Sequence, residues 1–122
     1  MGGEETDPLE AGMKVLRAEY LADAPERVRE LSAALGRLRA HDRSALGDLQ
    51  LYFHRLAGSG GSYGFPEITS RSRAAEHAVA ALVREDRALG RPDFSVLEQH
   101  VLAVAQAFQA AQRSVEEAEP PA

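Results

Sequence analysis

His54 is the side chain of this sequence best placed to do chemistry. In a helix it lies about 100° around the axis from Phe53, a member of an apolar stripe, so it stands at the border of the core and points toward solvent. Its same-face neighbours, one turn away in each direction, are Gln50 and Gly58. Glycine destabilises a helix by roughly 1 kcal/mol relative to alanine, so its use there indicates that something must come close. The pattern predicts an accessible imidazole beside a docking site, and the alternative is an ordinary solvated histidine.

Other arrangements that carry chemistry are missing from the sequence. It has no cysteine, which excludes disulfides, thiolate zinc sites and cysteine nucleophiles. His41, His77 and His100 form no pair four residues apart, and there is no His-Glu-x-x-His pattern, so we expect no metal site. A haem or di-metal bundle would need paired inward ligands, which the sequence does not offer. The glycine cluster 58–64 is not a nucleotide loop, because Tyr63 occupies the third glycine position and no Gly-Lys-Ser/Thr step follows.

Five segments have apolar residues at helical spacing, and none shows the strict alternation of a half-buried strand. Four of them run about 15–20 residues and are joined by short loops, which favours antiparallel packing of neighbours. We therefore predict an all-α fold, an antiparallel four-helix bundle with a short additional N-terminal capping helix. The five stripes are Leu9, Met13, Leu16 and Tyr20; Val28, Leu31, Leu35 and Leu38; Leu46, Leu49, Phe53 and Leu56; Ile68, Ala75, Val79 and Leu82; and Leu97, Val101, Val104 and Phe108.

Proline, aspartate and glycine mark where these helices should begin and end. Pro25 and Pro66 suit the first turn of the second and fourth helices. Asp42 and Asp93 are predicted N-caps of the third and fifth helices. The glycine cluster 58–64 is expected to end the third helix.

The 122-residue chain is expected to form one domain, residues 9–113. Residues 1–8 and 114–122 are rich in Gly, Pro and acidic side chains, which cannot contribute to a core, and we expect them to be disordered.

Composition limits the partners and the compartment. The formal net charge is −5 and no basic block occurs, so nucleic acid is not an expected partner. No apolar stretch approaches the ~20 residues that cross a bilayer. The polar, acidic N-terminus is unlike a signal peptide, so we expect a cytoplasmic protein. We also expect the protein to be a monomer and to bind no membrane.

The residues around His54 also match a family signature. The run His54-Arg55-Leu56-Ala57-Gly58-Ser59-Gly60-Gly61-Ser62-Tyr63-Gly64-Phe65 resembles the pattern His-x-Leu-Lys-Gly-Ser, small residues and an aromatic-Gly-aromatic step of histidine phosphotransfer (Hpt) domains. Ala75-Glu76 is similar to the place where the phosphotransfer domains of chemotaxis kinases carry a carboxylate that orients the histidine. The five-helix layout extends this resemblance over most of the chain.

The resemblance implies a role for each matching residue. His54 would accept the phosphoryl group through Nε2, because a neutral imidazole has one unprotonated nitrogen. Glu76 would accept a hydrogen bond from Nδ1–H and so fix the tautomer that leaves Nε2 free. Gly58 would leave room for a partner's active site, and Gly64 would serve a turn with positive φ. The alternative for Glu76 is a solvated carboxylate on a helix flank.

The partners implied are a response regulator receiver domain and a histidine kinase or hybrid kinase. The receiver would supply the acceptor aspartate, Mg²⁺ and a lysine. The chain itself would be a phosphocarrier without an ATP site, kinase activity or cofactor. Expected docking residues are Gln50, Leu51, Arg55, Gly58 and Arg73.

One position departs from the family pattern. Ala57 stands where the family often has a lysine near the phosphoryl oxygens, and Arg55 or Arg73 could replace that charge. The alternative function is a helical adaptor that keeps the bundle and binds partners without phosphotransfer.

Overall fold

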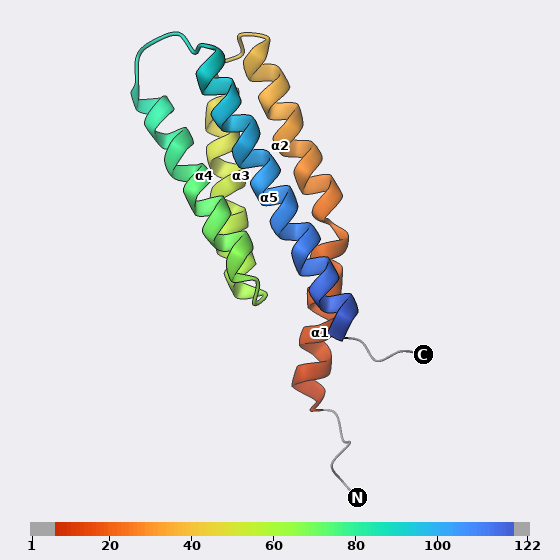
Figure 1. The fold of residues 1–122 in the computed structure, drawn as a ribbon. Coiled ribbons are helices and arrows are strands. Elements are labelled where there is room, and N and C mark those ends of the chain that lie inside the picture. Colours follow the sequence, from red (N-terminus) through yellow and green to blue (C-terminus); the bar gives the residue numbers. More distant parts are fainter. Residues whose placement is uncertain (1–6, 119–122) are drawn as a thin grey trace, which may run out of the picture.

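The computed structural model describes residues 7–118, which form five helices and no strand. Figure 1 shows the last four side by side, each running opposite to the one before it. Contacts join α2 to α3, α3 to α4, α4 to α5 and α5 back to α2, so these helices close a four-helix bundle. The all-α prediction is confirmed. The helices are α1 (Pro8–Ala22), α2 (Ala24–Arg39), α3 (Ala45–Ser62), α4 (Pro66–Arg84) and α5 (Arg91–Ala118).

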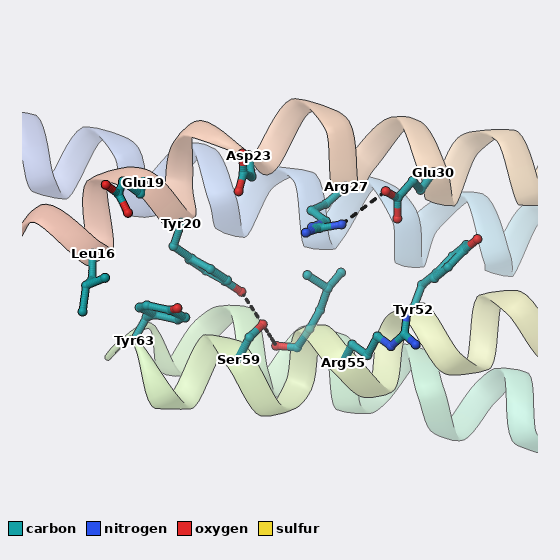
Figure 2. A pocket seen from close by; sticks show the side chains of 11 residues that line it. Leu16, Glu19, Tyr20, Asp23, Arg27, Glu30, Tyr52, Arg55, Ser59 and Tyr63 are labelled. Carbon is teal, nitrogen blue, oxygen red and sulfur yellow. Dashed lines mark hydrogen bonds and ion pairs between the residues drawn. The ribbon is translucent and has the colours of Figure 1, made fainter. Parts of the chain in front are cut away.

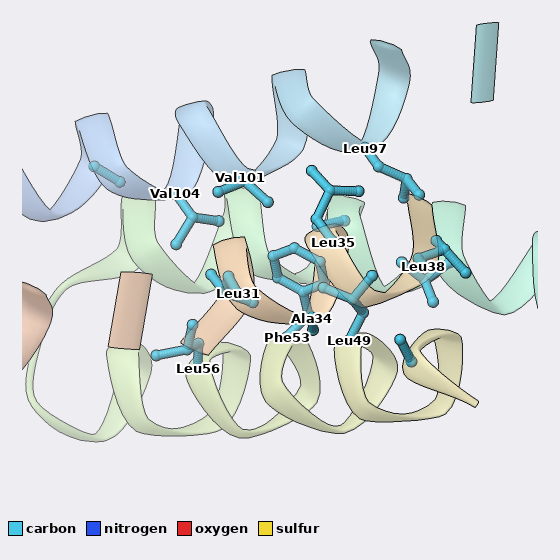
Figure 3. Close-up of a cluster of buried hydrophobic side chains, with 14 of the residues drawn as sticks. Leu31, Ala34, Leu35, Leu38, Leu49, Phe53, Leu56, Leu97, Val101 and Val104 are labelled. Carbon is cyan, nitrogen blue, oxygen red and sulfur yellow. The ribbon is translucent and has the colours of Figure 1, made fainter. Parts of the chain in front are cut away.

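The core lies between the four bundle helices, where their apolar stripes meet (Figure 3). The stripes predicted for α3, α4 and α5 are buried throughout, and in α2 only Val28 is less than fully buried. Phe53 is completely buried, and Leu31 of α2 and Val104 of α5 lie beside it in the same cluster. Burying such a side chain stabilises the fold by about 1.5–3 kcal/mol.

The additional N-terminal helix exists as α1, but it does not pack as its stripe suggested. Leu9 is 75% exposed and Leu16 is 44% exposed. A single residue with helical backbone angles, Asp23, joins α1 to α2. Figure 1 accordingly shows α1 extending below the bundle in line with α2. The predicted capping position is therefore not confirmed, since apolar spacing indicates a helix without saying what covers it.

The end of α1 is fastened to the end of α3. Arg17 Nε donates to the carbonyl oxygen of Tyr63 at 2.9 Å, and the hydroxyls of Tyr20 and Ser59 lie 2.8 Å apart. The rings of Tyr20 and Tyr63 are stacked with centroids 4.5 Å apart. Burial raises the pKa of the Tyr20 hydroxyl, although its bond to Ser59 acts in the opposite direction. These contacts fix α1 at the end of the bundle where α3 turns into α4.

Helix α3 ends inside the glycine cluster 58–64, as the sequence predicts, but only near the end of that cluster. The helix continues through it to Ser62, and the turn is made by Gly64 with a φ of +84°. At Gly60 an added Cβ would lie 2.9 Å from the backbone nitrogen of Thr69. Close packing against α4 therefore outweighs the low helix propensity of the cluster.

The other helix boundaries agree with the predicted ones only in part. Pro25 and Pro66 stand in the first turns of α2 and α4, as predicted. Asp42 instead lies in the turn before α3, where its carboxylate accepts from the backbone N–H of Ser44. At the chain ends, α1 begins at Pro8 and residues 114–118 belong to α5, so the predicted disordered ends are wrong there; residues 1–6 and 119–122 lie outside the described residues.

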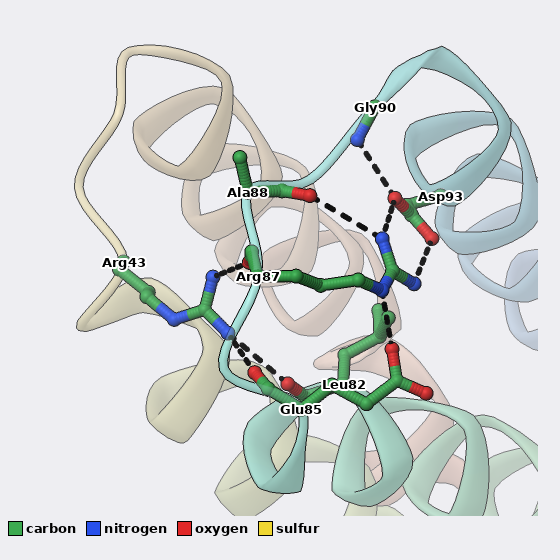
Figure 4. Close-up of polar contacts among 7 residues, drawn as sticks. All are labelled: Arg43, Leu82, Glu85, Arg87, Ala88, Gly90 and Asp93. Carbon is green, nitrogen blue, oxygen red and sulfur yellow. Dashed lines mark hydrogen bonds and ion pairs between the residues drawn. The ribbon is translucent and has the colours of Figure 1, made fainter.

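Asp93 lies inside the first turn of α5, and its carboxylate binds groups that precede the helix (Figure 4). Its Oδ2 accepts from the backbone N–H of Gly90 at 2.7 Å, and both of its oxygens accept from Arg87 at 2.9 Å. The Arg87 guanidinium first, and the Gly90 N–H second, lower the pKa of Asp93 from its ordinary 3.8 to about 2. Asp93 is thus a capping residue, but not the N-cap that the sequence predicted.

The loop between α4 and α5 also forms hydrogen bonds with the turn between α2 and α3. Arg43 donates to the carbonyl oxygens of Leu82, Glu85 and Arg87 (Figure 4). At this end of the bundle, one guanidinium group therefore binds three backbone carbonyl oxygens and connects the two loops.

Within residues 7–118, no helix combines the length and the hydropathy of a transmembrane segment.

The cap at Asp93 makes a prediction about acid stability. Because the folded-state pKa is below the unfolded value, the ionised carboxylate stabilises the fold above pH 4 and loses this effect as the pH falls toward 2. Asp93→Asn should lower the free energy of unfolding at pH 7 by about 1 kcal/mol, as for a lost helix cap. Urea titrations at several pH values should show this difference shrinking between pH 4 and pH 2.

The matched control is Asp86→Asn, a change of charge at an exposed position in the same loop. A constant difference between wild type and Asp93→Asn over that pH range would contradict the assigned role of the carboxylate.

Candidate functional site

His54 of α3 and Glu76 of α4 form a close polar pair on the outside of the bundle. The Nδ1 atom of His54 lies 3.0 Å from Oε1 and 3.1 Å from Oε2 of Glu76. The imidazole side chain is 72% exposed, whereas the carboxylate side chain is 24% exposed. An ionised carboxylate can only accept, so Nδ1 carries the proton and donates it. In a neutral ring this leaves Nε2 as the unprotonated, accessible nitrogen.

The helices place these two groups by burying their neighbours. Phe53 and Leu56 flank His54 in the sequence and are both in the core, which turns the imidazole outward. On α4, Ala75 is completely buried and Glu76 follows it at the edge of the contact with α3. The exposed position of His54 that the apolar stripe predicts is the position observed.

The surface one turn beyond His54 is bare. A Cβ added at Gly58 would meet no atom within 4 Å, so this glycine is not required by packing. Gly60, two residues later, is the opposite case, because its added Cβ would lie 2.9 Å from atoms of both Ile68 and Thr69. The cluster therefore contains a glycine that faces open space, Gly58, and another, Gly60, that lets α4 approach α3 closely.

The other predicted docking residues surround His54 on different sides. Leu51 is an exposed apolar side chain on α3, and Gln50 is half-buried. Arg73 is exposed on α4, one turn before Glu76, and lines a shallow hollow with Gly61 and His77.

Arg55 faces a different hollow, of about 400 Å³, between α3 and the junction of α1 with α2 (Figure 2). Tyr20, Tyr52 and Tyr63 also line it. Arg55 and Arg73 are therefore both exposed near His54, but they lie on different flanks of α3.

Ala57, which stands where the family often has a lysine, lies inside the contact between α3 and α4. Ala57 is nearly fully buried, and its carbonyl oxygen accepts from Thr69 Oγ1 at 2.6 Å. Arg71 supplies no charge beside His54, because it donates to Glu67 and to the carbonyl oxygen of Ala103 on α5. Arg73 is thus the arginine of α4 that shares a face with Glu76.

The chain matches the family model of the Hpt domain over residues 15–114. It belongs to the Hpt domain family. Hpt domains carry out histidine phosphotransfer in two-component signalling, interact with kinases and receiver domains, and are phosphocarrier modules rather than enzymes. No curated protein and no solved structure matched the chain. The matched residues include the whole of α2, α3 and α4, and with them His54 and Glu76.

The sequence did not indicate several of the contacts that shape this Hpt domain. Thr69 and Gly60 set the closest approach of α3 and α4, and Arg17 and Tyr20 fasten α1 to the end of α3. A glycine two residues after the exposed Gly58 could have indicated a helix crossing, because a buried glycine in a helix costs stability unless a neighbour uses the space. Within residues 7–118, no three His, Asp or Glu side chains are grouped to hold a metal ion.

The two glycines should respond in opposite ways to the same substitution. Gly58→Ala should raise the free energy of unfolding by up to about 1 kcal/mol, because alanine is the better helix former and its methyl group meets nothing. Gly60→Ala should lower it by about 1–3 kcal/mol, because the methyl group would overlap α4. Thermal and urea unfolding of both variants measure this, and equal effects would contradict the described packing.

Proposed function

We propose that His54 is the phosphoacceptor of a two-component phosphorelay, carrying a phosphoryl group on Nε2 from a kinase or a receiver aspartate to a receiver aspartate. The observation that supports this most is the exposed imidazole whose Nδ1 is bound by a carboxylate. A structural histidine at the surface has no need of a fixed tautomer. A helical adaptor would have no use for one either.

Phosphoryl transfer to His54 forms one bond to phosphorus and breaks another. The lone pair of Nε2 attacks phosphorus, a P–N bond forms, and the P–O bond to the donor breaks with its electron pair on the leaving oxygen. The proton stays on Nδ1, where the Glu76 carboxylate offsets the positive charge that develops on the ring. In the return step a receiver carboxylate attacks phosphorus in line and the P–N bond breaks. The receiver would bring Mg²⁺ and a lysine to neutralise the moving phosphoryl group.

Docking would use the face of α3 and α4 around His54. Gly58 leaves α3 bare one turn from the imidazole, and Leu51 offers an exposed apolar side chain one turn on the other side. Arg55 and Arg73 flank the ring and could steer the acidic active site of a receiver. Because position 57 is alanine and not lysine, another cation must contact the phosphoryl oxygens. We assign this contact to Arg73, because Arg73 lies on the same face of α4 as Glu76. The interface would be small and transient, with Gln50 at its edge.

The acceptor assignment is tested by labelling with a phospho-donor. Wild type should become labelled by a cognate phosphorylated receiver, and the label should be acid-labile, as expected for a phosphorus–nitrogen bond. His54→Gln should lose the label completely, while His77→Gln, an exposed histidine on α4, should keep it. Equal labelling of wild type and His54→Gln would rule out His54, and failure of wild type with every receiver and kinase tested would favour the adaptor.

Gly58→Leu tests the docking face separately from the chemistry. The larger side chain should lower kcat/KM for transfer with the receiver about tenfold or more, since even a 1 Å misplacement of reacting groups is costly. Labelling by phosphoramidate, a small donor that needs no docking, should stay as in wild type. The matched control is Gly36→Leu on α2, where an added Cβ also meets nothing within 4 Å. Equal loss in both leucine variants would contradict a specific role for the surface at Gly58.

A further inference from the structure

Thr69 marks the point at which α3 and α4 come closest. Its Oγ1 donates to the carbonyl oxygen of Ala57 at 2.6 Å. An added Cβ at Gly60 would lie 2.9 Å from the backbone nitrogen and Oγ1 of Thr69, and one at Gly61 would lie 3.3 Å from the same Oγ1. A side chain of α4 therefore rests directly on the backbone of α3, with two glycines making the room.

The direction of this hydrogen bond is informative. A threonine inside a helix commonly donates its hydroxyl to a carbonyl in the preceding turn of its own helix. Thr69 instead donates across to α3. A carbonyl oxygen has two lone pairs, so Ala57 can accept the hydroxyl while keeping its helical bond. The contact ties the two helices together at one defined level without weakening either.

The same seam carries the His54–Glu76 pair. Thr69 and Glu76 are two turns apart on one face of α4, a rise of about 10 Å, and Ala57 is less than one turn from His54 on α3. Sliding or rotating α4 by a fraction of a turn would separate Nδ1 from the carboxylate. The Thr69 bond opposes both movements.

We propose that Thr69 is a positioning residue for phosphotransfer, whose hydroxyl holds the α3–α4 register in which Glu76 orients the His54 imidazole. It acts through Glu76 and touches neither the ring nor the transferred group. Its effect on transfer rests on the proposed function of His54, whereas its effect on the ring can be measured without any phosphoryl donor.

The test compares Thr69→Val, which keeps the shape and removes the hydroxyl, with Thr69→Ser, which keeps the hydroxyl. The measurement is nitrogen-15 NMR of the His54 ring, at a pH at which the imidazole is neutral. It should show mainly the Nδ1–H tautomer in wild type and Thr69→Ser. Thr69→Val should give a mixture of tautomers, shifted toward that of Glu76→Gln. With a cognate receiver, kcat should fall three- to tenfold in Thr69→Val. KM should change less than kcat, because valine keeps the shape of threonine in the hollow that Thr69 lines together with Arg73.

A loss of stability alone must be separated from a loss of register. Leu38→Val, a core substitution near the end of α2, far from the turn between α3 and α4, serves as the control and should leave the tautomer and kcat as in wild type. Thr69→Ala replaces Thr69→Val if the latter does not fold, since alanine favours the helix. An unchanged tautomer in the variants without the hydroxyl, or an equal change in Leu38→Val, overturns the proposal.

These outcomes differ from those that concern the proposed function. If wild type accepts no phosphoryl group, the function assigned to His54 fails, yet the tautomer of the unmodified ring still decides the role of Thr69. If wild type is phosphorylated and Thr69→Val matches it in both measurements, only the positioning role is lost.

Discussion

The site depends on how closely two helix backbones approach each other. His54 and Glu76 are 22 residues apart in the chain and lie on different helices, so only the packing of α3 on α4 can bring them within 3.0 Å. That packing is closest at Gly60, where there is no room for a methyl group. The core stripes on the inner faces set the distance between the helices, and the contact at Thr69 sets their relative level.

Much of the bundle could be predicted from the spacing of apolar residues. The stripes of α3, α4 and α5 are buried as expected, because each helix of a closed bundle has neighbours on both sides. The stripe of α1 failed, since Leu9 and Leu16 have no helix to cover them. Spacing describes one helix at a time, and α1 differs from the others only in what lies beside it.

The candidate site was predictable to a similar extent. The angle between His54 and Phe53 indicated an exposed imidazole, and the structure shows one. The partner of that imidazole required the register of two helices, which no local pattern defines; Glu76 was expected only through the family resemblance. The sequence indicated that α3 ends in the glycine cluster, but not how far the helix continues into it, because Gly60 and Gly61 serve a tertiary contact that a propensity scale does not include.

The openness of the imidazole has a consequence for how long a signal could last. Residues 7–118 leave 72% of the His54 side chain exposed, so a phosphoryl group on its Nε2 would face solvent. Its survival would then be set by the intrinsic reactivity of the phosphorus–nitrogen bond and by how often receivers collide with it. The lifetime of the signal on a carrier of this kind would depend on the concentrations of its partners.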